Sequence, residues 1–182
     1  MPCTAAFTLI ELMVGIAVAA ILITVGIPGF RDLILDNRMA AQINSLVADL
    51  SYARSEAVKR NSAVTVCKRN INGTACDDSR SWTDGWIVLA GTTVLRVHES
   101  VSSGMAMNLK YTGSNKVVYD GKGFLNGVNN GTFIFCDGRG YTKARGLVLA
   151  MTGRLRTTRD DDGDDIQEKG SDRTNISQDD CS

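Results

Sequence analysis

Basic residues gather in the last third of the chain, in a pattern suited to binding phosphate. Between Asp137 and Arg159 the bases outnumber the single acid Asp137, and they are Arg139, Lys143, Arg145, Arg154, Arg156 and Arg159. If residues 154 to 157 form a strand, Arg154 and Arg156 share one face and Leu155 lies on the other, because side chains alternate along a strand. Two adjacent guanidinium groups are well suited to phosphate oxygens. This segment is therefore a candidate phosphate-binding element.

Acidic residues follow directly, and they offer an alternative to phosphate as partners of the arginines. From Asp160 to Ser182, two bases, Lys169 and Arg173, stand against nine acids, which are Asp160, Asp161, Asp162, Asp164, Asp165, Glu168, Asp172, Asp179 and Asp180. A tail of this charge could fold back, pair with the arginines and compete with phosphate within a Debye length of about 8 Å. No aromatic ladder accompanies the arginines, so any nucleic acid is expected to bind through its backbone and without sequence preference.

The acidic run also raises the question of calcium. With Gly163 at the invariant glycine of an EF-hand loop, Thr158 would occupy the first ligand position and Lys169 the last, and neither residue suits its position. An EF-hand is therefore excluded. A looser calcium loop over residues 160–165 and a solvated segment remain as alternatives.

The sequence contains few of the residue patterns that enzymes use for catalysis. It has one histidine, His98, and it lacks a GxSxG motif, a P-loop and a spaced set of metal ligands. No two of its cysteines have CxxC spacing, which argues against zinc. We expect neither catalysis nor a metal or other cofactor. The formal net charge of zero favours neither anionic nor cationic partners in bulk.

Four cysteines, Cys67, Cys76, Cys136 and Cys181, form an even set suited to two disulfides in an oxidising compartment. Three pairings of four cysteines exist. Because Cys67 and Cys76 flank a short polar loop, we expect them to close one hairpin, which leaves Cys136 to pair with Cys181.

The chain after Asn61 alternates between apolar and polar residues in short runs bounded by Gly, Asn, Asp and Ser. This pattern predicts antiparallel strands at 63–68, 85–90, 93–98, 116–120, 132–136, 146–151 and 154–157. Tight turns are expected at 90–92 and 151–153, and a loop at 121–131. Trp82 and Trp86 are expected to pack at the sheet edge rather than to act on the surface.

Two helical patterns precede these strands. Residues 31–60 repeat apolar residues at three- and four-residue steps, which predicts an amphipathic helix with one packed face. That face comprises Leu33, Ala40, Ile43, Leu46, Val47, Leu50, Ala53, Ala57 and Val58. Residues 7–30 are apolar all round apart from Glu11, and as a helix they are long enough to span a membrane. Pro28 and its neighbouring glycines are expected to kink the helix rather than to end it.

The start of this apolar stretch carries a resemblance. The run from Ala6 to Leu12, AFTLIEL, followed by the apolar helix with Pro28 near its end, is similar to the leader and first helix of type IV pilins and type II secretion pseudopilins. The resemblance implies that a prepilin peptidase cuts between Ala6 and Phe7 and methylates the new amine of Phe7. It also implies that Glu11, the fifth residue of the mature chain, neutralises that amine on a neighbouring subunit during filament assembly.

Segments from residue 50 onward resemble one branch of this group. LSYARSEAV from Leu50, VTVC from Val64, GWIV from Gly85, FCD from Phe135, ARGLV from Ala144 and TGRLR from Thr152 are similar to the GspH/FimT/FimU minor pilins. Their fold is α+β, with a long N-terminal helix packed on an antiparallel sheet domain. In the FimT branch a Gly-Arg-x-Arg motif binds DNA, and Gly153, Arg154, Leu155 and Arg156 match it, with Arg159, Lys143 and Arg145 nearby.

The resemblance implies a division into a leader at 1–6, a membrane and filament-core helix at 7–30, an amphipathic half-helix at 31–60 and a β-rich head with an acidic tail at 61–182. The implied partners are major and minor pilin subunits, prepilin peptidase, the inner-membrane assembly platform and double-stranded DNA. The implied location is the bacterial inner membrane, crossed once with the head in the periplasm, and then a pilus. A type II secretion pseudopilin in a pseudopilus, without a nucleic-acid role, is the alternative.

Overall fold

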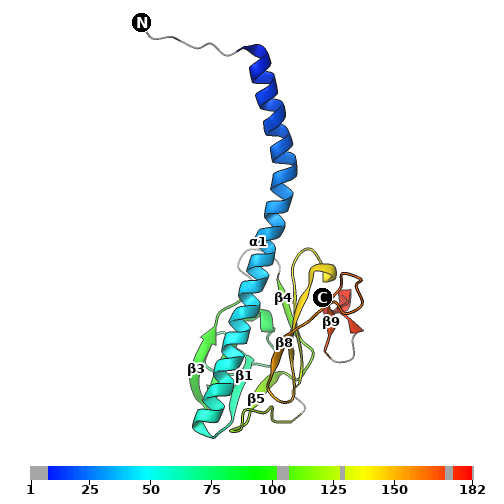
Figure 1. Cartoon of the computed structure of the whole chain (residues 1–182). Coiled ribbons are helices and arrows are strands. Elements are labelled where there is room, and N and C mark those ends of the chain that lie inside the picture. The colour runs from blue at the N-terminus through cyan, green and yellow to red at the C-terminus, as the bar shows by residue number, and fades with distance from the viewer. Residues whose placement is uncertain (1–7, 102–106, 128–129, 171–173, 182) are drawn as a thin grey trace. The chain divides into compact units, whose positions relative to one another are not determined.

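A computed structural model describes residues 8–101, 107–127, 130–170 and 174–181, without the side chains of 25–28 (Figure 1). The chain divides into two compact units, Met1–Arg38 and Met39–Ser182. The boundary between them falls within the long helix α1, Leu9–Arg60. We refer to the second unit as the head.

The first unit contains the apolar part of α1. Its helix is long and apolar enough to cross a membrane, with a mean hydropathy of 2.5 over the most apolar window, none of which is buried within the chain. The helix continues through Pro28, so the predicted absence of a stop is confirmed. Helices that are apolar all round need apolar surroundings on every side. This unit must therefore obtain its burial from a membrane or from other subunits.

In the head, α1 provides one stripe of the hydrophobic core. Met39, Leu46, Leu50, Ala53 and Ala57 are fully buried in it. Their three-, four- and seven-residue spacing is that of one helix face, as predicted. Figure 1 shows this cyan part of α1 lying along the strands of the head.

Two members of the predicted stripe do not belong to it. Val58 is 51% exposed, and Leu33, in the first unit, is 54% exposed. Met39, which the prediction omitted, is fully buried. Val58 follows Ala57 directly and is rotated by about 100° from it on the helix. The prediction from apolar spacing alone therefore made the buried face of the helix too wide.

Two antiparallel four-stranded sheets cover α1 in the head. The first has the order β3-β2-β1-β5 and the second β4-β6-β7-β8. The strands of the first are β1 Val64–Lys68, β2 Trp86–Ala90, β3 Thr93–His98 and β5 Lys116–Tyr119. Those of the second are β4 Asn108–Tyr111, β6 Gly131–Cys136, β7 Arg145–Leu149 and β8 Leu155–Thr157. A two-stranded ribbon joins β9 Glu168–Lys169 to β10 Thr174–Asn175. Short 3₁₀ helices lie at Trp82–Asp84, Tyr141–Lys143 and Gln178–Asp180.

The α+β fold with a long helix and antiparallel sheets is as predicted, and the seven predicted strands are present with small shifts of their ends. Three strands were missed. β4, with the sequence NLKY, contains no β-branched residue, and it is held by pairing Leu109 with Phe135 and Tyr111 with Phe133. β9 and β10 have two residues each, too few to show a period.

The core of the head joins α1 to both sheets, and the aromatic side chains form its centre. Trp86 and Phe133 are fully buried and Trp82 nearly so. Trp82 meets Phe133 edge to face at 5.0 Å between ring centroids, and Tyr111 stacks on Phe133 at 4.0 Å. The tryptophans therefore pack, as predicted, but in the core rather than at a sheet edge.

Candidate functional site

The predicted phosphate-binding element lies at an edge of the second sheet. Arg154 and Arg156 are both exposed, and Arg156 lies on the edge strand β8 opposite Val148 of β7. Arg156 donates a hydrogen bond to the carbonyl of Gly170, whereas Arg154 lies at the turn before β8. The two guanidinium groups therefore have different surroundings.

The other predicted cations are distributed differently. Arg139 donates to the buried carboxylate of Asp137 from Nε, at 3.1 Å to each oxygen, and from Nη2 at 2.7 Å, and this ion pair removes it from the candidate site. Burial raises the pKa of Asp137, but the hydrogen bonds from Arg139 outweigh it and leave the pKa below its usual range. Lys143, Arg145 and Arg159 are exposed. The patch expected from the sequence thus loses one of its charges.

The described acids of the tail form no ion pair with the arginines of β8 or its turn. Among the described residues, Arg154, Arg156 and Arg159 make no salt bridge. The acids bind their own backbone instead. Asp160 accepts the amides of Gly163 and Asp165 at 2.6 and 2.9 Å, and both oxygens of Glu168 accept the amide of Asp161. The predicted competition by direct pairing is therefore absent from this part of the structure.

The turn that carries Arg154 is held by a helix side chain. Arg54 of α1 donates from Nε to the carbonyl of Gly123 at 2.9 Å and from Nη2 to the carbonyl of Thr152 at 3.1 Å. Gly153 has a φ of +73°, and a Cβ there would meet the Gly123 carbonyl. Its backbone angle and its burial require glycine. Gly153 therefore shapes the turn and does not itself present a surface to a ligand.

A groove runs between α1 and this turn, with a volume of about 820 Å³. Its lining includes four cations from three segments, Arg54 and Lys59 from α1, Lys122 from the loop after β5 and Arg154. No acid is among the described residues of the lining. Sequence analysis missed Lys59 and Lys122 because both are far from Arg154 along the chain, and no local pattern connects them.

A second polar cluster, also missed, surrounds Asp49 on the buried side of α1. Its Oδ2 accepts the indole N–H of Trp86 at 2.8 Å and lies 3.4 Å from Nδ1 of His98, and its Oδ1 accepts from Arg96 at 2.8 Å. Burial raises the pKa of Asp49, but the hydrogen bonds from His98, Arg96 and Trp86 lower it by more. The pKa of Asp49 therefore lies below its usual value. His98 stacks on Trp86 at 4.0 Å. The cluster attaches the exposed strand β3 to the helix.

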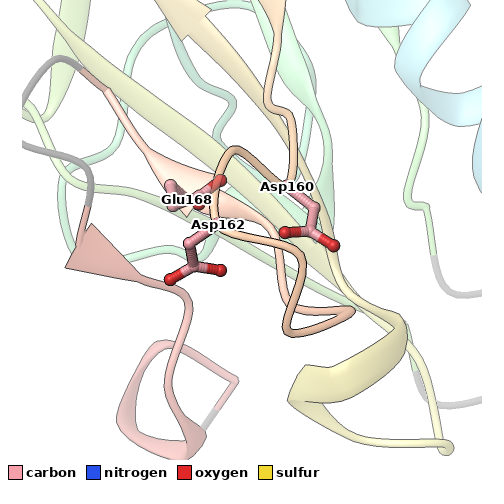
Figure 2. Close-up of side chains that lie close together, drawn as sticks. All are labelled: Asp160, Asp162 and Glu168. Carbon is pink, nitrogen blue, oxygen red and sulfur yellow. The ribbon is translucent and has the colours of Figure 1, made fainter.

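The acidic loop gathers three carboxylates. Figure 2 shows Asp160, Asp162 and Glu168 around one bend. One carboxylate oxygen from each of the three lies within 4.8 Å of the other two. The amide of Gly163 is the main cause that lowers the pKa of Asp160. Backbone amides donate to the oxygens of Asp160 and Glu168, and these hydrogen bonds hold the loop in its bend.

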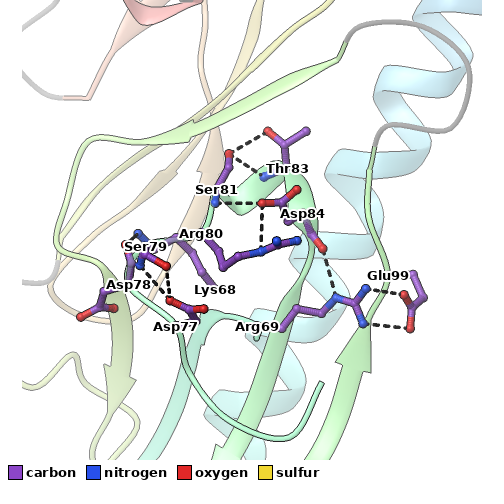
Figure 3. Close-up of polar contacts among 10 residues, drawn as sticks. All are labelled: Lys68, Arg69, Asp77, Asp78, Ser79, Arg80, Ser81, Thr83, Asp84 and Glu99. Atoms are coloured by element: carbon purple, nitrogen blue, oxygen red, sulfur yellow. Dashed lines mark hydrogen bonds and ion pairs between the residues drawn. The ribbon is translucent and has the colours of Figure 1, made fainter. Parts of the chain in front are cut away.

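The two disulfides join Cys67 to Cys76 and Cys136 to Cys181, which are the predicted pairs. A polar network continues from the first (Figure 3). There Arg69 forms a two-point ion pair with Glu99, at 2.7 and 3.2 Å, and its Nε donates to the carbonyl of Asp84. These contacts tie the Cys67–Cys76 loop to the ends of β2 and β3, and they fix structure rather than form a binding site.

At the other end of the chain, Ala6 and Phe7 lie outside the described residues. Glu11 is exposed near the start of α1. Its amide donates to the hydroxyl of Thr8 at 3.3 Å, and that hydroxyl lies 3.5 Å from its carboxylate. This is an N-terminal capping arrangement. Among the described residues, Thr8 is the one side-chain partner of Glu11.

Comparison with known families decides the class of the molecule. The prokaryotic N-terminal methylation motif matches residues 1–27, and the family described as type II transport protein GspH matches residues 42–153. The second match covers more than half of the chain. The chain belongs to the GspH family. This GspH-family protein is thus a minor pilin or pseudopilin, from a family of structural subunits, and the predicted relationship is confirmed.

The fold of this GspH-family protein has a solved counterpart. A crystal structure of the type IV minor pilin FimU of Pseudomonas aeruginosa matches with a TM-score of 0.55 and 23% identity, covering 68% of this chain and 90% of that chain. A second crystal form matches at a TM-score of 0.48 and 24% identity, covering 64% and 89%. At this identity the likeness establishes the pilin fold alone. A search of the curated proteins gives no match.

The family and its motif also establish location and general partners. The methylation motif and the apolar helix are those of a pilin anchored in the inner membrane and later assembled into a filament. Association with other pilin subunits and processing as a prepilin follow from the same match.

Proposed function

We propose that the protein is a minor subunit of a type IV pilus, placed at the filament tip, and that Glu11 drives its incorporation. In this proposal the peptidase cuts before Phe7 and methylates it, and Glu11 neutralises the amine of Phe7 on a neighbouring subunit. The observation that carries it is the isolation of Glu11 in an apolar helix. A charge in such surroundings needs an opposite charge, and a low-dielectric filament core strengthens the pair.

The experiment compares Glu11→Ala with Thr8→Val. Glu11→Ala removes the charge and the contact between the Thr8 hydroxyl and the carboxylate, whereas Thr8→Val keeps the charge and removes both contacts of that hydroxyl. We expect Glu11→Ala to stay in the membrane and to be absent from sheared filaments, while Thr8→Val assembles as the unmodified protein does. Normal recovery of Glu11→Ala in filaments would refute the assignment. Equal loss with both variants would assign the effect to helix capping.

A type II secretion pseudopilin is the alternative, and the GspH match alone gives it support. The two differ in their partners, because pilus and secretion subunits are encoded beside different genes. Deletion of the gene should abolish surface piliation if the pilus assignment holds. Loss of protein secretion with intact pili would establish the pseudopilin instead.

We further propose that the head binds double-stranded DNA through the arginines around β8. Support comes from the exposure of Arg154, Arg156 and Arg159 and from the absence of an ion pair on any of them within the described part of the chain. Phosphate contacts of this kind bind DNA without reading its sequence. A minor pilin with this property would serve DNA uptake in natural transformation.

Fluorescence anisotropy of a labelled duplex with the full chain in neutral detergent micelles tests this proposal. We expect salt-sensitive binding that is lost in the variant carrying Arg154→Ala and Arg156→Ala. Arg139→Ala is not a suitable control, because it would leave the carboxylate of Asp137 buried and unpaired. Lys116→Gln, an exposed position on β5, is the matched control and should bind as the unmodified protein does. The absence of binding at low salt would reject the proposal.

A further inference from the structure

We propose that the DNA-binding surface does not end at β8 but continues through the groove, where Lys122 and Lys59 bind successive backbone phosphates beyond Arg154. This inference rests on the DNA-binding function proposed above. It adds two residues from segments that are distant in the sequence, one on α1 and one in the loop after β5. Nothing in the Gly153–Arg156 motif points to them.

The charge of the groove supports this. Its lining contains Lys59, Lys122, Arg154 and Arg54, and no acid among the residues that the structure describes. Lys122 and Arg154 make no ion pair among the described residues. Lys59 lies 3.6 Å from Glu56, but that carboxylate also binds Arg60 at 2.7 Å, so the three side chains together keep a positive charge. The described lining of the groove therefore carries a net positive charge.

The cations are held on ordered segments rather than on free loops. The carboxylate of Asp120 accepts the amides of Lys122 and Phe124, each at 2.9 Å, and so fixes the loop that carries Lys122. Arg54 joins that loop to the Arg154 turn through the carbonyls of Gly123 and Thr152. Because the loop, the turn and the helix are connected in this way, a bound backbone would meet the three exposed cations in a constant arrangement.

The floor of the groove suits the sugar part of a nucleic acid. Val47, Val58 and Leu155 line it, and Val58 remains half exposed. Deoxyribose is largely apolar, whereas the phosphates on either side of it are charged. An apolar floor with a cationic rim matches that alternation. An acidic peptide with apolar side chains would present a related pattern, and the experiment must separate the two.

The experiment measures duplex binding to the full chain in neutral detergent micelles, over a series of salt concentrations. Lys59→Gln and Lys122→Gln are compared with Lys116→Gln, which removes the same charge outside the groove. Each groove variant should weaken binding about three- to tenfold and reduce the slope of log K against log salt by about 0.9, the value for one lost phosphate contact. Lys116→Gln should change affinity less than about twofold, since it removes only a distant charge.

The outcomes separate the two proposals. If neither groove variant differs from Lys116→Gln while Arg154→Ala with Arg156→Ala still abolishes binding, the groove is not part of the surface and the DNA function stands. If the unmodified protein binds no duplex, both proposals fail. A polyglutamate competitor of equal total charge should displace the duplex poorly. Displacement as efficient as that by unlabelled duplex would overturn the groove as a nucleic-acid site and assign it to acidic peptides.

Discussion

The two parts of α1 contain the same kinds of apolar residues, but these are buried in the head and exposed in the first unit. In the head, Met39, Leu46 and Leu50 are fully buried against the sheets of the same chain. In the first unit, Leu9, Ile16 and Leu22 are more than half exposed. A striped helix needs one apolar neighbour, whereas a helix that is apolar all round needs apolar surroundings on every side. The chain therefore buries the apolar side chains of the head by itself. The apolar side chains of the first unit must be buried by a membrane or by other subunits.

The largest effect is expected from a substitution that creates a cavity in the core of the head. Phe133 is fully buried and contacts Trp82 and Tyr111, so Phe133→Ala should lower the free energy of unfolding of the head by about 3–5 kcal/mol. Denaturant unfolding of the full chain in micelles, followed by tryptophan fluorescence, reports the head alone, because both tryptophans lie there. A loss below about 1 kcal/mol would show that the head does not depend on its own core.

The two disulfides should stabilise the head unequally. Cys136–Cys181 closes a loop of sequence separation 45, and Cys67–Cys76 one of 9. Loop-closure entropy predicts losses of about 4 and about 2.6 kcal/mol when each pair is changed to serine. The same fluorescence assay ranks them. The opposite ranking would mean that the polar network around Arg69 depends on the short loop more than its closure entropy indicates.

A smaller effect is expected at the Asp49 cluster, and it should depend on pH. Asp49→Asn keeps the shape but weakens the bonds to Arg96 and Trp86, which should lower stability by about 1–3 kcal/mol near neutral pH. The pKa of Asp49 is lowered in the folded state, so its carboxylate stabilises the fold above the unfolded value of 3.8. That contribution is lost as the pH falls through the lowered pKa. Unfolding curves of the two proteins should therefore converge below about pH 4, and a constant difference down to pH 2 would contradict this account.

The smallest effect on the stability of the head is expected from a substitution in the first unit. Ile16→Ala removes apolar surface from a side chain that is 62% exposed within the chain, so the unfolding of the head should change by less than about 0.5 kcal/mol. The same variant should weaken retention in the membrane or in the filament, where that surface is covered. Membrane fractionation and filament shearing measure it. A lowered melting temperature of the head would show that the anchor contributes to its folding.

Much of the fold could be predicted because its signals are local. The stripe of Ile43, Leu46 and Leu50 reports one buried helix face, and the short apolar and β-branched runs of β1, β2 and β6 report strands that are buried along most of their length. β4 could not be predicted, since its residues take their strand structure from pairing with β6. The candidate DNA site was predicted in part. Arg154 and Arg156 stand in one short motif, but Lys59 and Lys122 join them only through the packing of α1 against two loops.

The amino-acid sequence alone determined the class of this protein, because an apolar helix with one acid and a striped continuation are linear patterns with direct physical meaning. It also determined the disulfide pairs, which follow from the short polar loop between Cys67 and Cys76. Only the tertiary structure decided which charges are available. Arg139 is bound to Asp137, Asp160 and Glu168 accept backbone amides of their own loop, and Arg54 brings the turn of Arg154 beside the loop of Lys122. Electrostatic interactions depend on distance in space. The sequence alone shows neither which of several neighbouring charges will pair nor that Arg54 reaches carbonyls 69 and 98 residues away.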